Sequence, residues 1–369
     1  MNYNAQPYGR YISAGLGDRL RRRMLDNWRG QEPYAALRPL GALYGWGVRL
    51  HRKLYGPLFH SEKAAAPVIS IGNLTVGGSG KTPMCLALSR LLMDRDRRPA
   101  ILSRGYGRRA PRTDAPLIVG SGRGEPSTSP LESGDEPWLM ASQLPGLRVV
   151  VDADRVRAAR TAVEHLKADL LILDDGHQQL RLAADCRVLL VPARNPFGNG
   201  AVLPAGPLRE PLAAHRRADV LVSAGAERPA PEVMELAGGR PVFAAEYHST
   251  GWRPLGSREA LPPEALSGRR VFAFCGLGRP ESFERSLQRL KVDIRYFVAL
   301  PDHFEYGREA LDGLGLGFMS TGAEFLVTTA KDAVKIPADF PLPVMVLQME
   351  MAISRADEFV DTVLRIAKR

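Results

Sequence analysis

The chain has 369 residues, 45% hydrophobic and 24% charged, which is a globular composition and excludes a disordered chain. Its formal net charge of +10 favours anionic partners: phosphorylated small molecules, anionic lipid or nucleic acid. Three widely spaced cysteines without a CxxC pair argue against a disulfide framework or a zinc site. No stretch reaches the ~18 apolar residues of a membrane-spanning helix, and no signal-peptide pattern is expected at the N-terminus.

The segment LGALYGWGVRLHRKLYGPLF (40–59) predicts a helix with one apolar stripe. The stripe consists of Leu40, Leu43, Leu50, Leu54 and Leu58, and the basic residues Arg49, Arg52 and Lys53 fall largely outside it. Tyrosine and tryptophan nearby suit a membrane surface. Two interpretations stay open on these residues alone: a helix lying on a membrane, or, slightly favoured, one packed on its own domain.

The rest of the chain alternates between predicted strands and helices, which indicates an α/β protein with a parallel, doubly wound sheet. The first half has strands at 66–73, 99–108, 147–155, 169–175 and 186–193. A Pro/Gly-rich connection at 195–211 follows, and the second half has strands at 218–224, 241–247, 270–278, 292–300, 324–330 and 344–350. A helix at 354–369 ends the chain.

The turn after the first strand reads NLTVGGSGKTP (73–83) and ends like the phosphate-binding pattern G-x-x-x-x-G-K-[ST]. Thr75 stands where that pattern has its first glycine. Gly77, Gly78 and Gly80 still allow a tight backbone, Lys81 can reach the β- and γ-phosphates, and Thr82 can bind Mg²⁺. We therefore interpret the stretch as a variant phosphate loop, the alternative being a glycine-rich turn before a helix.

Such a loop requires an apolar strand that ends in aspartate, and LLILDD ends in Asp174 and Asp175. Consecutive strand residues point to opposite faces, so we expect one of the two carboxylates to face the metal directly. The Asn-Lys-x-Asp pattern that reads guanine is absent, which favours ATP over GTP.

The motifs together resemble the tetraacyldisaccharide 4′-kinase family of lipid A synthesis. They are NLTVGGSGKTP, SRGYGR (103–108), SGDEP (133–137), LDDGHQQ (173–179), NPFGNGAVLPAGPLREP (195–211), FCGLGRPESF (274–283), PDHFEY (301–306) and TTAKDAVK (328–335), in the family's order from about residue 35 onward. The resemblance implies Mg²⁺-dependent transfer of the ATP γ-phosphate to the 4′-hydroxyl of a lipid A disaccharide precursor.

The resemblance also implies roles for individual residues. Nucleotide contacts would come from Asn73, Thr75, Val76, Gly77, Gly78, Ser79, Gly80, Lys81 and Thr82. Metal ligands would be Thr82, Asp174 and Asp175, and substrate contacts Glu136, Gln179, Arg209 and Arg104. Asp135 would be the base, paired with His303 across a domain cleft, and Lys81 would stabilise the transferred phosphate. Arg104 and Arg108 could contact phosphate, and the equally favoured alternative is that both are ordinary loop arginines.

The expected organisation is an N-terminal extension (1–34), a membrane-associating amphipathic helix (35–60), a P-loop kinase domain (61–212), a second, smaller α/β domain closing over the cleft (213–352) and a C-terminal helix (353–369). A substrate of this kind makes membrane contact the favoured interpretation of the helix. The resemblance thus implies a peripheral monomer on the cytoplasmic face of the bacterial inner membrane.

Three positions depart from the family pattern. The family's usual Asp-Asp-Gly-Phe-Gln-His is Asp-Asp-Gly-His-Gln-Gln here, so His177 replaces an aromatic residue and Gln179 a histidine, and Ala330 replaces a glutamate. A glutamine cannot carry a proton, so a proton-linked role at position 179 is in doubt.

The function has two rival interpretations. A nucleotide-switched binding protein would show a guanine-reading motif and a Cys/His metal cluster, and this sequence has neither. A small-molecule kinase without membrane contact is the other. A nucleic-acid binder is disfavoured because no recognised module is present.

Overall fold

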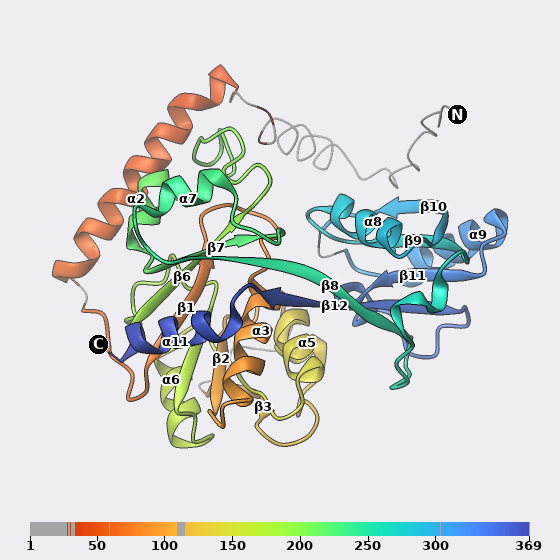
Figure 1. The fold of residues 1–369 in the computed structure, drawn as a ribbon, viewed down its shortest axis with the longest axis horizontal. Helices are drawn as coiled ribbons and strands as arrows, with labels where there is room; N and C mark the ends of the chain where they lie inside the picture. The colour runs from red at the N-terminus through yellow and green to blue at the C-terminus, as the bar shows by residue number, and fades with distance from the viewer. Residues whose placement is uncertain are drawn as a thin grey trace. The chain divides into compact units, whose positions relative to one another are not determined.

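The computed structural model describes residues 28, 30, 34–58, 60–108, 115–302 and 304–368. His303 and most of the expected N-terminal extension lie outside these residues. The chain divides into a larger unit, formed by Leu20–Tyr247 and Met351–Arg369, and a smaller unit that contains His248–Glu350 (Figure 1). Strand β8 (Val242–Pro254) carries the chain into the smaller unit, and strand β12 (Val344–Ile353) carries it back.

In the larger unit the strand order is β8-β7-β6-β1-β5-β2-β4-β3. The other strands are β1 (Val68–Asn73), β2 (Pro99–Ser103), β3 (Leu117–Ser121), β4 (Arg148–Val151), β5 (Leu170–Asp174), β6 (Cys186–Pro192) and β7 (Val220–Ala224). All pairings are parallel except that of the edge strand β3 with β4. The parallel sheet of a P-loop protein is thereby confirmed.

Helices cover both faces of this sheet because alternate strand residues point to opposite sides. Ile69 and Ile71 of β1 pack in one apolar cluster with helices α3, α5 and α11, whereas Val68 packs in another with α6. The helices are η1 (Ala35–Leu37), α2 (Arg38–Leu58), α3 (Lys81–Met93), α4 (Pro130–Ser133), α5 (Asp135–Gln143), α6 (Arg155–Glu164), η2 (Leu212–Arg217), α7 (Pro231–Ala237) and α11 (Ala356–Ala367). Figure 1 shows α11, the last helix of the chain, beside α3.

Helix α2 runs along the outside of the larger unit (Figure 1). It meets the connection after β6 through small residues: a Cβ built on Gly41 would lie 3.0 Å from the Cβ of Ala205, and one on Gly45 3.2 Å from Val202 Cγ2. Large apolar side chains on the helix are exposed, namely Leu40, Leu43, Tyr44, Trp46, Leu50 and Leu54. Within the described ranges, no helix has both the length and the apolar character needed to cross a membrane.

The smaller unit also has a parallel sheet with helices on both faces, and its strand order is β10-β9-β11-β12. Its elements are η3 (Pro263–Leu266), β9 (Arg270–Cys275), α8 (Pro280–Arg289), β10 (Asp293–Ala299), α9 (Arg308–Thr321), β11 (Phe325–Thr329) and α10 (Ala330–Ala333). Helix α8 covers one face through Phe283 and Leu287, and α9 covers the other through Leu311 and Leu314.

Two differences from the sequence-based expectation concern the edge of the sheet and the domain boundary. Strand β3 lies in a segment without a predicted strand, between the expected strands at 99–108 and 147–155. The expected boundary after residue 212 falls inside the larger unit, because β7 and the first half of β8 extend its sheet through pairing with β6 and β7.

The return of the chain through α11 should contribute strongly to the stability of the larger unit. Phe359 is fully buried and meets Phe243 edge to face, with ring centroids 5.2 Å apart. We expect Phe359→Ala to lower the free energy of unfolding by about 3–5 kcal/mol, because it removes buried area and leaves a cavity. The exposed Arg365→Ala on the same helix should change it by less than about 0.5 kcal/mol. Urea denaturation followed by circular dichroism would measure both, and equal effects would contradict this packing role.

Candidate functional site

The loop that follows β1 has the conformation of a phosphate-binding loop. Gly77 and Gly80 have φ values of +101° and +86°, which side-chain-bearing residues rarely adopt. A Cβ built on Gly77 or Gly78 would meet no described atom within 4 Å, so the backbone there faces open space. Helix α3 begins directly after Gly80, so its N-terminal dipole points at the same space.

Thr75 is compatible with this loop because the chain is still extended there. It forms an antiparallel bridge with Leu208, and the neighbouring Val76 N–H donates to the carbonyl of Pro207 at 2.9 Å. The tight turn therefore starts after Thr75, and a glycine at this position is not required.

Lys81 and Ser79 have the placement expected of phosphate ligands. The Lys81 ammonium lies 3.3 Å from Asn73 Oδ1 and 3.6 Å from Asp175 Oδ1. The Ser79 hydroxyl is buried and has no hydrogen-bond partner among the described residues. An unpaired buried hydroxyl costs free energy, so this side chain fits a bound phosphate or a metal-bound water.

The two aspartates at the end of β5 have different environments. Asp174 is buried, and it accepts hydrogen bonds from the Ser103 hydroxyl at 3.3 Å and the Cys85 thiol at 3.8 Å. Burial, together with the negative charges of Glu136 and Asp175, raises the pKa of Asp174 to about 6. The proximity of so many carboxylates favours a bound cation here.

Asp175 instead lies between two cations. Arg209 donates to Asp175 Oδ2 at 2.8 Å, and Lys81 faces the other oxygen. Burial raises the pKa of Asp175, but the charges of Lys81 and Arg209 outweigh burial and lower it below the ordinary value. Asp175 also has a positive φ of +54°, which turns the chain sharply after the strand.

The turn that follows β2 lies against the start of α5. A Cβ on Gly134 would lie 2.8 Å from the carbonyl oxygen of Tyr106, so the SRGYGR and SGDEP motifs touch through backbone. Asp135 and Glu136 form the first turn of α5, and Glu136 is close enough to raise the pKa of Asp174. The structure therefore brings the SGDEP motif close to the aspartate that ends β5.

Arg155 is a site residue that sequence reasoning missed. It is 7% exposed, its guanidinium donates to the Asp152 carbonyl, and its Nε has no hydrogen-bond partner among the described residues. Burial lowers its pKa to about 10, and the charge of Asp174 acts in the opposite direction. Its position after the strand end VVVDAD could have indicated it, because residues after parallel strands gather at one edge of the sheet.

Glu210 is a second missed residue and is 2% exposed. Its carboxylate accepts hydrogen bonds from Arg217 at 2.8 and 2.9 Å, Gln178 at 3.1 Å and Arg52 of α2 at 3.4 Å. Gln178 also donates to the Asn73 carbonyl at 3.0 Å. The position of Glu210 beside Arg209 in the GPLREP motif could have indicated that it lies near the site.

Two predicted substrate residues have different environments, and Arg104 is close enough to Arg155 for its charge to lower the pKa of that side chain. Gln179 Oε1 accepts from the backbone N–H groups of Leu180 and Arg181, at 2.9 and 3.3 Å, and so caps its own turn. Arg104 is exposed after the end of β2. Neither arrangement tests a contact with a substrate.

His177 has a structural environment. It is 2% exposed, its Nε2–H donates to the Ala214 carbonyl at 3.2 Å, and a Cβ on Gly72 would clash with its backbone. Burial lowers the pKa of His177 to about 3, and the positive charge of Arg217 acts in the same direction. This side chain is therefore neutral and packed at neutral pH.

Considered by itself, the smaller unit gathers three of the sequence motifs around one buried carboxylate. Asp332 accepts hydrogen bonds from the Gly276 N–H at 3.0 Å, the Tyr306 hydroxyl at 2.9 Å and the Thr329 hydroxyl at 2.6 Å. Lys331 pairs with Asp302 at 3.0 Å. Asp302 and Tyr306 are thus both held by side chains of the TTAKDAVK motif.

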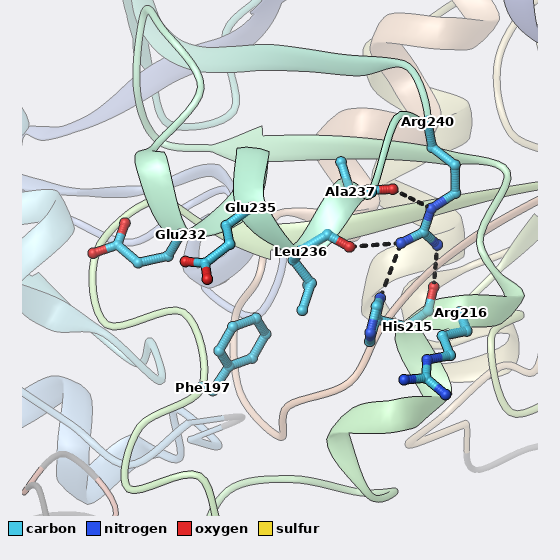
Figure 2. A pocket seen from close by; sticks show the side chains of 9 residues that line it. Phe197, His215, Arg216, Glu232, Glu235, Leu236, Ala237 and Arg240 are labelled. Atoms are coloured by element: carbon cyan, nitrogen blue, oxygen red, sulfur yellow. Dashed lines mark hydrogen bonds between the residues drawn. The ribbon is translucent and has the colours of Figure 1, made fainter.

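A separate hollow of about 670 Å³ in the larger unit is lined by η2, α7 and Phe197 (Figure 2). Arg240 in its wall donates all five N–H groups: to the carbonyls of Leu236, Ala237, His215 and Ala218 and to His215 Nδ1. This arginine clamps helix ends and has no donor left for a ligand. The phosphate loop does not line the hollow.

The described residues contain no group of three or more His, Cys, Asp or Glu side chains that could hold a metal ion. Mg²⁺ commonly binds through one or two carboxylates plus substrate phosphates and water. Thr82 at the start of α3, with Asp174 and the unpaired Ser79 hydroxyl, fits such a site.

Comparison with known proteins agrees with this geometry. The family described as Tetraacyldisaccharide-1-P 4'-kinase matches residues 33–368. Proteins named Tetraacyldisaccharide 4'-kinase are similar: one from Anaeromyxobacter dehalogenans (strain 2CP-C) is 45% identical over 82% of this chain and 78% of its own, and one from Syntrophus aciditrophicus is 38% identical over 92% and 94%. A crystal structure of LpxK from Aquifex aeolicus in complex with ATP is 34% identical, with a TM-score of 0.72 over 90% of this chain and 98% of that one.

The neutral, buried state of His177 gives a stability prediction. Its pKa is about 3 in the folded protein and about 6.5 in an unfolded chain, so the unfolded chain binds more protons between these values. Stability is therefore lost as pH falls through this window, by about 2 kcal/mol from pH 7 to pH 5 for this group. Urea denaturation at pH 7 and pH 5 would measure the loss in the free energy of unfolding. We expect this loss to be about 2 kcal/mol smaller in His177→Phe than in the wild type. Equal losses in both proteins would contradict the assignment.

Proposed function

Because the chain belongs to the tetraacyldisaccharide-1-phosphate 4′-kinase family, we propose that it transfers the γ-phosphate of ATP to the 4′-hydroxyl of a tetraacyldisaccharide 1-phosphate, a lipid A precursor. The product would be the 4′-phosphorylated lipid. The observation that carries this proposal is the open phosphate loop, with Lys81 and the paired aspartates, in a chain matched by the family over nearly its full length.

The phosphate loop would bind and orient ATP. Its backbone N–H groups would receive the phosphate oxygens, and Lys81 would leave Asp175 to meet the β- and γ-phosphates. Thr82 and Asp174 would hold Mg²⁺, with Asp175 close by, and the ion would neutralise charge that develops on the transferred phosphate. Arg155, which has an unused buried N–H, would supply further positive charge.

Asp135 would act as the base at the acceptor. The 4′-hydroxyl oxygen forms a bond to the γ-phosphorus, the bond from that phosphorus to the β-phosphate oxygen breaks, and ADP leaves. The hydroxyl proton passes to the Asp135 carboxylate, and His303 would assist, as the resemblance implies. Glu136 would lie beside the acceptor, and Arg209 would meet phosphate charge.

Helix α2 would hold the enzyme on the membrane that contains its lipid substrate. Six large apolar side chains on α2 are exposed: Leu40 at 53%, Leu43 at 64%, Tyr44 at 40%, Trp46 at 61%, Leu50 at 37% and Leu54 at 46%. Exposed Arg49 and Lys53 on the same helix would meet anionic head groups. The protein would therefore bind peripherally, at the cytoplasmic face of the inner membrane.

The kinase assignment predicts lipid phosphorylation. With labelled ATP and Mg²⁺, the wild type should label a lipid A disaccharide 1-phosphate in detergent micelles. Lys81→Ala should lose at least a hundredfold, because it removes charge stabilisation of the transferred phosphate, and Asp135→Ala should lose a comparable factor. The exposed Arg365→Ala on α11 is the control. ATP hydrolysis without lipid labelling would overturn the assigned acceptor and favour a nucleotide-switched protein.

The docking assignment predicts loss of vesicle binding. Leu43→Glu with Trp46→Glu should weaken binding to vesicles with anionic phospholipid at least tenfold, because burying each large apolar side chain contributes about 1.5–3 kcal/mol. Leu316→Glu with Met319→Glu, on exposed positions of α9, makes the same kind of change elsewhere. Co-sedimentation would measure both variants, and equal binding by them would exclude α2 as the docking element.

A further inference from the structure

The connection at 202–211 lies directly between helix α2 and the phosphate loop. On one side, Val202 and Ala205 contact the glycine positions of α2. On the other, the Arg209 N–H donates to the Leu74 carbonyl at 2.7 Å, and the Pro207 carbonyl accepts from Val76 N–H. A shift of α2 relative to this connection would therefore be felt in the backbone of the phosphate loop.

A set of ionic contacts between partly buried side chains crosses the same region. Glu210 binds Arg52 of α2, and from Glu210 two routes lead to Lys81. One passes through the neighbouring Arg209, which pairs with Asp175, which in turn faces Lys81. The other passes through Gln178 and Asn73: Gln178 holds the Asn73 carbonyl, and Asn73 Oδ1 faces the Lys81 ammonium.

Arg52 differs from the other cations of α2. Arg49 and Lys53 are exposed, whereas the Arg52 side chain is 22% exposed and points to a carboxylate that is only 3% exposed. A general lipid-binding charge has no need of such a partner. The contact is also long, at 3.4 Å, so it can tighten when the helix is fixed.

We propose that Arg52 and Glu210 are positioning residues that couple docking of α2 on an anionic lipid surface to the phosphate loop, so that the surface tightens ATP binding before any acceptor is bound. The inference rests on the proposed docking of α2 and on the proposed nucleotide site.

The physical basis is the way in which α2 contacts the connection at 202–211. Helix α2 contacts the connection at Gly41 and Gly45 and pairs with it through Arg52 and Glu210, while six of its large apolar side chains are exposed. Docking restrains the helix and hence the connection, and a ligand that binds an already restrained loop loses less conformational entropy. Linkage requires the effect to be reciprocal, so ATP must strengthen vesicle binding by the same factor.

The test measures the affinity of a non-hydrolysable ATP analogue, with Mg²⁺, in buffer and on saturating vesicles that contain anionic phospholipid but no disaccharide lipid. We expect the wild type to bind the analogue about fivefold more tightly on vesicles, at the low end of common coupling. The analogue should raise vesicle affinity by the same factor. Arg52→Gln should bind vesicles when they are in excess but show no change in analogue affinity.

Arg49→Gln is the matched control, because it removes the same charge from the same helix without a contact to Glu210. It should keep the vesicle effect at saturation. Glu210→Gln is the second variant and should lose the effect as Arg52→Gln does, with thermal unfolding measured to recognise a folding defect.

Equal analogue affinity of the wild type with and without vesicles would overturn the coupling, as would an unchanged vesicle effect in Arg52→Gln. These outcomes are separate from failure of the proposed function. A protein that phosphorylates the lipid but shows no vesicle effect retains its function without the coupling. A protein with the vesicle effect but no lipid phosphorylation retains the coupling with another acceptor.

Discussion

The ion pairs of Asp175 with Lys81 and Arg209 connect the parts of the site. Asp175 directly follows the central buried strand β5, Lys81 begins the helix after β1, and Arg209 comes from the connection after β6. These side chains are partly buried, and each charge has an opposite partner, so the three favour one mutual arrangement. A bound nucleotide would bring negative charge and its metal, and the existing pairs would then have to rearrange. In the site as described, the acidic and basic side chains are therefore paired with one another.

Sequence reasoning located those parts of the site that depend on local backbone geometry. A buried strand followed by glycines and Lys81 indicates a phosphate loop, and an apolar strand that ends in Asp174 indicates its partner. Thr75 could be accepted as a variant, but the reason, its bridge to Leu208, is a contact between distant segments. The edge strand β3 was missed because its pairing partner, β4, follows two helices later.

The missed residues share one property: their meaning depends on distant partners. Glu210 looks like a loop carboxylate until Arg52, Gln178 and Arg217 are seen around it. Arg155 looks like an ordinary helical arginine until its burial near Asp174 is known. His177, which stands where the family usually has an aromatic residue, is neutral and packed because its surroundings lower its pKa.

The packing of α2 against the connection at 202–211 limits how this protein can be engineered. Truncation of the helix is an obvious route to an easily handled, lipid-independent form. Such a truncation would uncover Val202 and Ala205 and remove the arginine that faces Glu210. The shortened protein would carry an altered nucleotide site, so its kinetics would not describe the parent. Polar replacements on the outward face of α2, which leave Gly41, Gly45 and Arg52 in place, give a more faithful soluble form.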